Sequence, residues 1–277
     1  MVLGTGQPLG APAAGRQALG KINPDLVKWA APSNDREWTA DQAVLPFIEF
    51  HGNQVSVRNI RNCEYRTVDD YDVHHYDKTF DLDRLESVDF VVVPFEDIPG
   101  IAHTMLSFGF RDQGYLGVSV EIRKERGESY SPVKGFFRQY ELMYVLADER
   151  DLILKQSLHY LCDVLVYRSS ATPAQCRDLL LDVFARVNKL HEEPEFYHTV
   201  ANNCTTNLRN HVNRLAPDRV PYDYRVLLPA YSDRLAFDLG LLERRGTFEE
   251  TRAAAKVNYH AYLHESSPDF SEQIRLR

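Results

Sequence analysis

The sequence predicts an α+β fold, in which an antiparallel sheet from the first two thirds of the chain packs against helices from the last third. Three observations support this prediction. Up to about residue 167, short runs of β-branched and aromatic residues alternate with turn sequences. From residue 172 onward, apolar residues recur at the spacing of amphipathic helices. The composition, 44% hydrophobic and 26% charged, is that of an ordinary globular chain.

The length of 277 residues allows one large domain or two small ones. Residues 1–32 hold Gly, Pro and Ala without a period, and we expect a flexible tail there, followed by a single domain over residues 33–277. The net charge of −8 disfavours nucleic-acid binding, because a protein that follows a phosphate backbone needs a basic face. No stretch of 18 uncharged apolar residues is present, so we expect no membrane-spanning segment.

The N-terminus does not match the pattern of a signal peptide. It has no Lys or Arg before Arg16 and no continuous apolar region. From this feature alone we expect a cytoplasmic protein without an export signal of its own.

The first strands are expected at residues 47–50 and 54–60, which flank the hairpin turn Gly52-Asn53. A third short strand is expected at 63–68. Residues 69–86 are acidic and aromatic without a clean period, which favours a surface excursion, with a lid over the site as the alternative.

The β-branched run at residues 88–95 predicts a buried strand. Two further strands, 102–110 and 115–122, are joined by the turn sequence Arg111-Asp112-Gln113-Gly114. The last strands are expected at 141–146 and 159–167.

The first helix is expected to begin after Thr172, which is followed by Pro173 and, three positions after the cap, by Gln175. Apolar residues then recur at helical spacing to about residue 190. A second helix is expected from Asn203 to Pro217, and a third over residues 232–242.

Cys204 is the main candidate nucleophile. It lies in the first turn of the second expected helix, where the helix dipole stabilises a thiolate and lowers the pKa of the thiol. The unpaired N–H groups of that turn could form an oxyanion hole, supported by Asn202, Asn203 and Thr205. The alternative is a small buried cysteine at a helix end, with both asparagines serving only as caps.

His103 is the candidate base, because a thiol nucleophile needs an imidazole within hydrogen-bond reach. Ser119 and Glu121 lie on one face of the next strand, and either could orient the ring as the third member of a triad. We prefer Glu121, because a carboxylate also stabilises an imidazolium. The alternatives are a structural histidine bonded to a backbone carbonyl and, for the glutamate, an ion pair with Arg123, Lys124 or Arg126.

Other histidines are weaker candidates. His198 is an alternative base, but Asn202-Asn203 separates it from Cys204. His211 follows the cysteine by seven residues, which is roughly 10 Å along a helix and too far for direct proton transfer. The segment 72–77 holds two histidines and two aspartates without helical spacing, so we expect no metal site there. No cofactor-binding glycine motif is present, and no cofactor is expected.

Two motifs are shared with a known family: H-T-x-x-S-F-G-F at residues 103–110 and N-C-T-T-N at residues 203–207. On these motifs the sequence resembles the Lnb N-terminal periplasmic domain family of Gram-negative bacteria. Shorter matching blocks extend the likeness over residues 33–277; they lie at 36–38, 119–123, 140–142, 148–151 and 231–234.

The resemblance implies a papain-like, NlpC-related thiol fold in circularly permuted order, with His before Cys, as in lecithin:retinol acyltransferase-like enzymes. The family is named for a lipoprotein N-acyltransferase, whose proposed chemistry uses a Cys–His pair. By motif, Cys204 would be the nucleophile and His103 the base, whereas Glu121 as third member is inferred from the neighbouring strand. The resemblance also implies a periplasmic location.

We therefore expect a cysteine-dependent acyltransferase that forms a thioester on Cys204 from a phospholipid acyl chain and passes it to an amine. The expected partners are a phospholipid donor and a lipoprotein N-terminus, with peripheral membrane contact as an option. The alternatives are a papain-like cysteine peptidase or amidase acting on cell-wall peptide, and a catalytically silent binding module.

Overall fold

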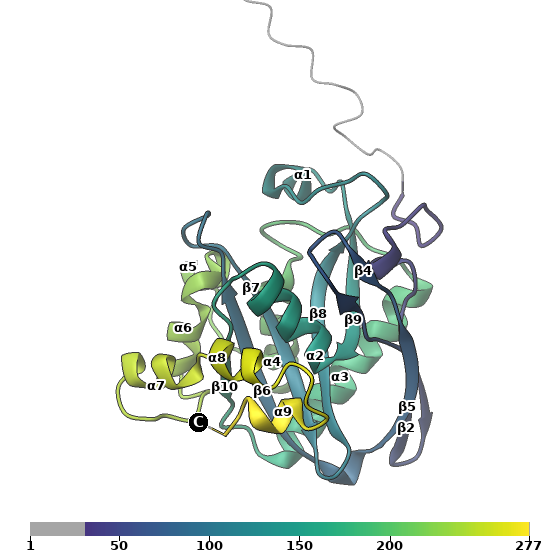
Figure 1. Ribbon diagram of the computed structural model, residues 1–277. Coiled ribbons are helices and arrows are strands. Elements are labelled where there is room, and N and C mark those ends of the chain that lie inside the picture. Colours follow the sequence, from purple (N-terminus) through teal and green to yellow (C-terminus); the bar gives the residue numbers. More distant parts are fainter. Residues whose placement is uncertain (1–30, 277) are drawn as a thin grey trace, which may run out of the picture.

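The computed structural model describes residues 31–276 (Figure 1). The expected tail over residues 1–32 lies outside the described residues, apart from its last two positions. Within the described part, strands come mainly from the first two thirds of the chain and helices from the last third. The predicted α+β class with a mostly antiparallel sheet is confirmed.

The core of the fold is an eight-stranded sheet with the order β1-β2-β9-β8-β7-β6-β10, in which β5 also pairs with β2. Neighbouring strands are antiparallel except β2 and β9, which are joined in parallel through Arg61 and Ala147. The strands are β1 (Phe47–His51), β2 (Gln54–Arg61), β5 (His75–Asp81), β6 (Leu85–Pro94), β7 (Ala102–Phe110), β8 (Gly114–Arg123), β9 (Glu141–Asp148) and β10 (Leu165–Arg168).

Helices cover both faces of this sheet (Figure 1). The long helices α3 and α4 pack on one face around a large apolar cluster that includes Leu180 and Phe184. Helices α2, α8 and α9 cover the other face through residues such as Ile153 and Phe270. The helices are α1 (Pro132–Phe136), α2 (Glu149–Leu154), α3 (Pro173–Glu192), α4 (Cys204–Leu215), α5 (Tyr224–Leu227), α6 (Ser232–Asp238), α7 (Phe248–Ala255), α8 (Asn258–Leu263) and α9 (Phe270–Gln273).

Local sequence features set several of these boundaries. His51 and Gln54 are paired, so Gly52 and Asn53 form the two-residue hairpin loop that the sequence predicts, and Gly52 has a φ of 66° that suits glycine. Helix α3 begins with a complete capping box between Thr172 and Gln175. Both features depend on residues within a few positions of one another.

The interpretation of residues 69–86 as an excursion or a lid is wrong for most of that segment. Strand β5 is hydrogen-bonded to β2 and belongs to the sheet. The third expected strand, 63–68, is reduced to β3 (Glu64–Tyr65), which pairs with β4 (Tyr71–Asp72). Strand β5 was missed because it is an outer strand in which Phe80 alone is fully buried, so its sequence has no apolar alternation.

Two later boundaries also differ from the prediction. The expected strand 159–167 is confined to β10, because a π-helical turn, Lys155–His159, continues α2. Helix α6 ends at Asp238 rather than at residue 242. Gly240 follows with a φ of 67°, a left-handed conformation that stops a helix.

Candidate active site

The candidate site lies where β7 and β8 cease to pair. Their ladder ends at Met105 and Ser119, although β7 begins at Ala102 and β8 continues to Arg123. Because side chains alternate along a strand, His103 shares a face with Met105, whereas Thr104 points to the opposite face. Helix α4 packs against β7, and its N-terminus brings Cys204 close to both His103 and Thr104.

Cys204 is the first residue of α4, and His103 lies close enough to its thiol to control the ionisation of the sulfur. Thr104 also lies beside the sulfur and helps to lower the pKa of the thiol. The cysteine is only 7% exposed, so most water is excluded from the pair. The structure thus brings together the two residues that the sequence selected, from positions about a hundred residues apart.

Behind the imidazole lies a chain of two hydrogen bonds. Nε2 of His103 is 2.7 Å from Oγ of Ser119. The same hydroxyl donates to Oε1 of Glu121 at 2.8 Å. The sequence left open whether Ser119 or Glu121 orients the ring. In the structure the two act in series, with the serine in direct contact and the glutamate one step behind.

This chain determines which imidazole nitrogen carries a proton. Glu121 is ionised and can only accept hydrogen bonds, so the single proton of the Ser119 hydroxyl points to it. The serine oxygen must then accept from Nε2–H of His103. Nδ1 is the nitrogen left to face the Cys204 thiol, as a base or, once protonated, as the partner of a thiolate.

The electrostatics favour a thiolate–imidazolium pair. Burial alone would raise the pKa of Cys204, but the hydrogen bond and charge of His103, together with the bonds from Thr104, lower it to about 6. Burial would lower the pKa of His103, but the sulfur and the charge of Glu121 raise it. Near neutral pH the proton therefore belongs on the imidazole rather than on sulfur.

The other three cysteines differ from Cys204 in this respect. Burial raises the pKa of Cys63 to about 12 and that of Cys176 to about 11. The pKa of Cys162 is also raised, mainly by burial. Among the four, Cys204 alone combines a lowered pKa with a base, which supports its choice as the nucleophile.

A charged cluster that the sequence did not predict supports Glu121. Gln42 donates to Oε2 of the carboxylate at 3.2 Å, and Arg61 lies 3.9 Å from the same oxygen. Arg61 is in turn held by Asp151 through two hydrogen bonds of 2.8 and 3.0 Å. Burial would raise the pKa of Glu121, but Arg61, Lys155, His103 and the serine hydroxyl lower it to about 2. The ion-pair partner is thus Arg61, from a distant strand, rather than Arg123, Lys124 or Arg126.

The predicted supporting residues lie in the first turn of α4. Asn203 is the N-cap, and its side chain accepts from the Thr206 N–H in a reciprocal capping box. Asn202 donates to the Phe196 carbonyl and accepts from Asn207. These asparagine side chains hold the turn in place. The capping bond uses the N–H of Thr206, and the helical i→i−4 hydrogen bonds begin with the N–H of Asn207. The N–H groups of Cys204 and Thr205 take part in neither.

The other candidate histidines have different partners. Nδ1 of His198 accepts from the backbone N–H groups of Val200 and Ala201, so it stabilises the loop before α4. His211 is buried between Tyr144 and Asp182, and burial lowers its pKa to about 4. In residues 31–276, no group of three or more His, Cys, Asp or Glu is arranged to hold a metal ion.

A sequence model of the Lnb N-terminal periplasmic domain matches residues 71–230, which is more than half of the chain and includes His103, Ser119, Glu121 and Cys204. The chain belongs to the Lnb N-terminal periplasmic domain family. The resemblance noted from the two motifs is therefore confirmed. No curated protein and no solved structure matches the sequence.

The periplasmic description of the Lnb N-terminal domain agrees with the location that the resemblance implies. None of the helices in the described part of the chain has the length and hydropathy needed to cross a bilayer.

Proposed function

We propose that this protein is a thiol acyltransferase that carries a fatty acyl group as a thioester on Cys204. The observation that supports this most directly is the pairing of Cys204 at the start of α4 with His103 on β7, which lowers the pKa of the thiol to about 6. A thiolate available at neutral pH is a strong nucleophile, and the adjacent imidazolium is a ready proton donor.

In the first step the Cys204 thiolate attacks the ester carbonyl carbon of a phospholipid. A C–S bond forms and the carbonyl electron pair moves to oxygen. The N–H groups of Cys204 and Thr205 are suited to hold this oxyanion. The C–O bond of the ester then breaks, and the proton on Nδ1 of His103 passes to the departing lysophospholipid.

In the second step a primary amine attacks the thioester. His103, now neutral, removes the proton from the attacking nitrogen. The C–S bond breaks to give an amide and regenerate the thiolate. The Ser119–Glu121 chain keeps Nδ1 directed to the sulfur in both steps and stabilises the imidazolium whenever it forms.

Family membership supports the choice of donor and acceptor, because the family is named for a lipoprotein N-acyltransferase. We therefore propose a phospholipid as donor, the N-terminus of a lipoprotein as acceptor, and the periplasm as the place of action. We also propose that the fold is a permuted papain-like one. Its support is the order along the chain, with the histidine on a strand before the cysteine at a helix N-terminus.

Intact-protein mass spectrometry after incubation with vesicles of phosphatidylethanolamine and phosphatidylglycerol tests the proposal. We expect an acyl-sized mass gain that hydroxylamine removes, in the wild type but not in Cys204→Ala. Cys162→Ala is the matched control, because it removes a half-buried thiol with a raised pKa, and it should acylate like the wild type.

Three results would overturn the assignment. An adduct that persists in Cys204→Ala would mean that another group is acylated. Absence of an adduct from every protein, together with Cys204-dependent hydrolysis of a cell-wall peptide, would identify a peptidase or amidase. Inertness of Cys204 toward iodoacetamide at neutral pH would instead indicate a silent module.

A further inference from the structure

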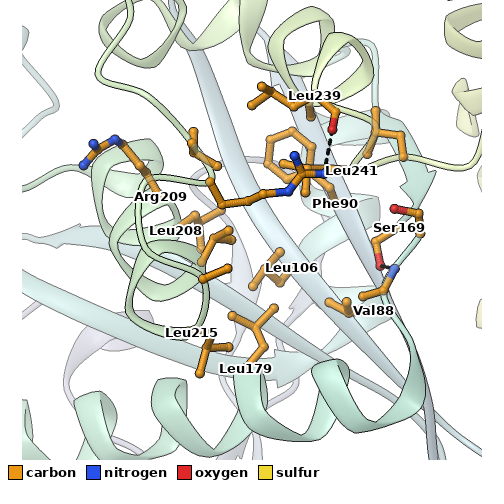
Figure 2. Close-up of a pocket in the computed structure, with 18 of the residues that line it drawn as sticks. Val88, Phe90, Leu106, Ser169, Leu179, Leu208, Arg209, Leu215, Leu239 and Leu241 are labelled. Carbon is orange, nitrogen blue, oxygen red and sulfur yellow. Dashed lines mark hydrogen bonds between the residues drawn. The ribbon is translucent and has the colours of Figure 1, made fainter.

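We infer that the apolar pocket along helix α4 holds the hydrocarbon chain of the acyl group carried by Cys204. The pocket has a volume of about 390 Å³ and lies between helices α3, α4 and α6 and strands β6 and β7 (Figure 2). This size is within the range of small-molecule sites. The inference rests on the proposed function and names where its substrate would bind.

One residue of the pocket wall lies beside the nucleophile. Thr205 follows Cys204 directly, its Oγ1 lies 3.7 Å from the sulfur, and it lines the pocket, whereas Cys204 itself does not. The Thr205 hydroxyl is also paired with that of Thr104 at 3.2 Å. A chain attached to the sulfur would therefore pass Thr205 to enter the pocket at this end.

From that end the pocket follows the helix axis. Thr205, Leu208, Val212 and Leu215 line it at three- and four-residue spacing, so they form one stripe along α4. Ten residues separate the first from the last, which corresponds to about 15 Å at 1.5 Å per residue. The pocket is thus an elongated slot rather than a compact cavity, and a straight hydrocarbon chain fits this shape.

The walls favour hydrocarbon over peptide. Figure 2 shows Leu106, Leu179 and Leu208 surrounding the same space from β7, α3 and α4. Arg209 belongs to the lining but its guanidinium is directed away, toward the Pro221 carbonyl and the Tyr222 ring. The lining also includes polar residues, namely Ser169, Ser170, Gln175, Asp178, Arg219 and Ser232. A peptide laid along the apolar stripe of α4 would still leave N–H and C=O groups without partners there, which is costly. An acyl chain brings none.

The pocket lies between two apolar clusters. Leu106, Leu179 and Leu208 belong to the main one, whereas Val220 and Leu235 belong to a small separate one. The pocket is partly open to solvent, and Leu215 on its wall is 43% exposed. A hydrocarbon chain between the two clusters would remove this apolar surface from water and make contacts with both.

Arg219 marks the outer side of the pocket. It belongs to the lining, and its guanidinium donates to the Leu239 carbonyl at 2.6 Å. This bond links the segment after α4 to the end of α6 at the surface. A bound chain would lie beneath it.

Binding of the fluorescent fatty acid cis-parinaric acid to the Cys204→Ala protein tests the pocket without any chemistry at the thiol. We expect saturable binding that is weakened at least tenfold by Val212→Trp, which fills the slot. Val44→Trp is the matched control, because Val44 is 40% exposed and outside the lining, and it should leave binding unchanged. Leu215→Trp provides a second pocket variant at a position already 43% exposed, where the fold tolerates a large side chain.

The same tryptophan substitutions in the protein with Cys204 intact separate this inference from the proposed function. We expect the acyl adduct to shift from 16-carbon toward 8-carbon chains. An adduct with unchanged yield and chain length in both pocket variants would refute acyl-chain binding in this pocket, while the acyltransferase activity would still stand. Parinaric acid binding that depends on the pocket, without any acyl adduct, would support acyl-chain binding in the pocket and refute the acyltransferase activity. Absence of parinaric acid binding, or equal loss in Val44→Trp, would refute the pocket.

Discussion

The Ser119 hydroxyl lies between His103 and Glu121, 2.7 Å from Nε2 of the imidazole and 2.8 Å from the carboxylate. The negative charge therefore acts on the imidazole through one intervening hydroxyl. Because that hydroxyl donates to the carboxylate, it accepts from the ring and directs the other nitrogen to Cys204.

Ser119→Ala breaks this chain while leaving His103, Glu121 and Cys204 in place. The imidazolium loses its hydrogen-bonded link to Glu121, so the pKa of Cys204 should rise from about 6 toward that of an ordinary thiol. The midpoint of the iodoacetamide alkylation rate against pH measures this shift. Ser56→Ala is the control. Ser56 is also a buried serine on a strand, and its hydroxyl is hydrogen-bonded to Thr79 on a neighbouring strand. If both variants keep the wild-type midpoint, Ser119 is not a positioning residue.

The pH profile of the wild type follows from the two shifted pKa values. A thiol with a pKa of about 6 is ionised above that pH, so alkylation should increase through pH 6 and then remain constant. Acyl transfer should also decrease at high pH, because it needs the protonated imidazole of His103, whose pKa is raised.

His103→Ala removes the stabilising charge and should move the alkylation midpoint above pH 8. It should also slow acyl transfer by roughly 10²–10⁴-fold, the usual contribution of general acid–base catalysis. Alkylation of the wild type that still increases steeply above pH 8 would contradict the ion pair.

The N-cap of α4 links stability to reactivity. Asn203→Ala removes the capping box before Cys204 and should lower the free energy of unfolding by about 0.5–2 kcal/mol. It should also slow alkylation of Cys204, because the first turn no longer holds the thiol in place.

Thr172→Ala provides the comparison, since it removes an equivalent capping box from α3. It should cost a similar amount of stability in urea unfolding but leave alkylation unchanged. Equal alkylation rates in the two variants would mean that the Asn203 cap does not position the thiol.

The buried cation behind the site can be tested by Arg61→Met. Arg61 is 2% exposed and paired with Asp151 and Glu121, so its loss leaves the buried carboxylate of Asp151 and the half-buried one of Glu121 without this cation. We expect a loss of about 3–5 kcal/mol in the free energy of unfolding, measured with urea.

Arg66→Met is the matched control, because Arg66 pairs with Asp70 and Asp72 at the surface, with half of its side chain exposed. It should leave the free energy of unfolding nearly unchanged, because water and salt screen exposed pairs. A similar decrease in the free energy of unfolding in both variants would show that the buried cluster contributes no more to stability than an exposed ion pair.

Local patterns were sufficient for much of the fold. The hairpin at Gly52 and the capping box at Thr172 each depend on residues within four positions, and both are present as predicted. The position of Cys204 at a helix start was predicted in the same way. Where local pattern was weak the prediction failed, as for β5, an outer strand with little buried apolar surface.

The sequence by itself determined the fold class, the family and the selection of Cys204 and His103, because motif spacing and hydrophobic period are properties of short segments. Only the tertiary structure decided that Ser119 and Glu121 act in series and that Arg61 stands behind them. The Arg61 side chain comes within 3.9 Å of Glu121 because a single strand, β9, separates β2 from β8 in the sheet. The slot beside α4 likewise exists only because α3, α4 and α6 meet there. Strand order and helix packing depend on contacts between distant segments, which no local pattern encodes.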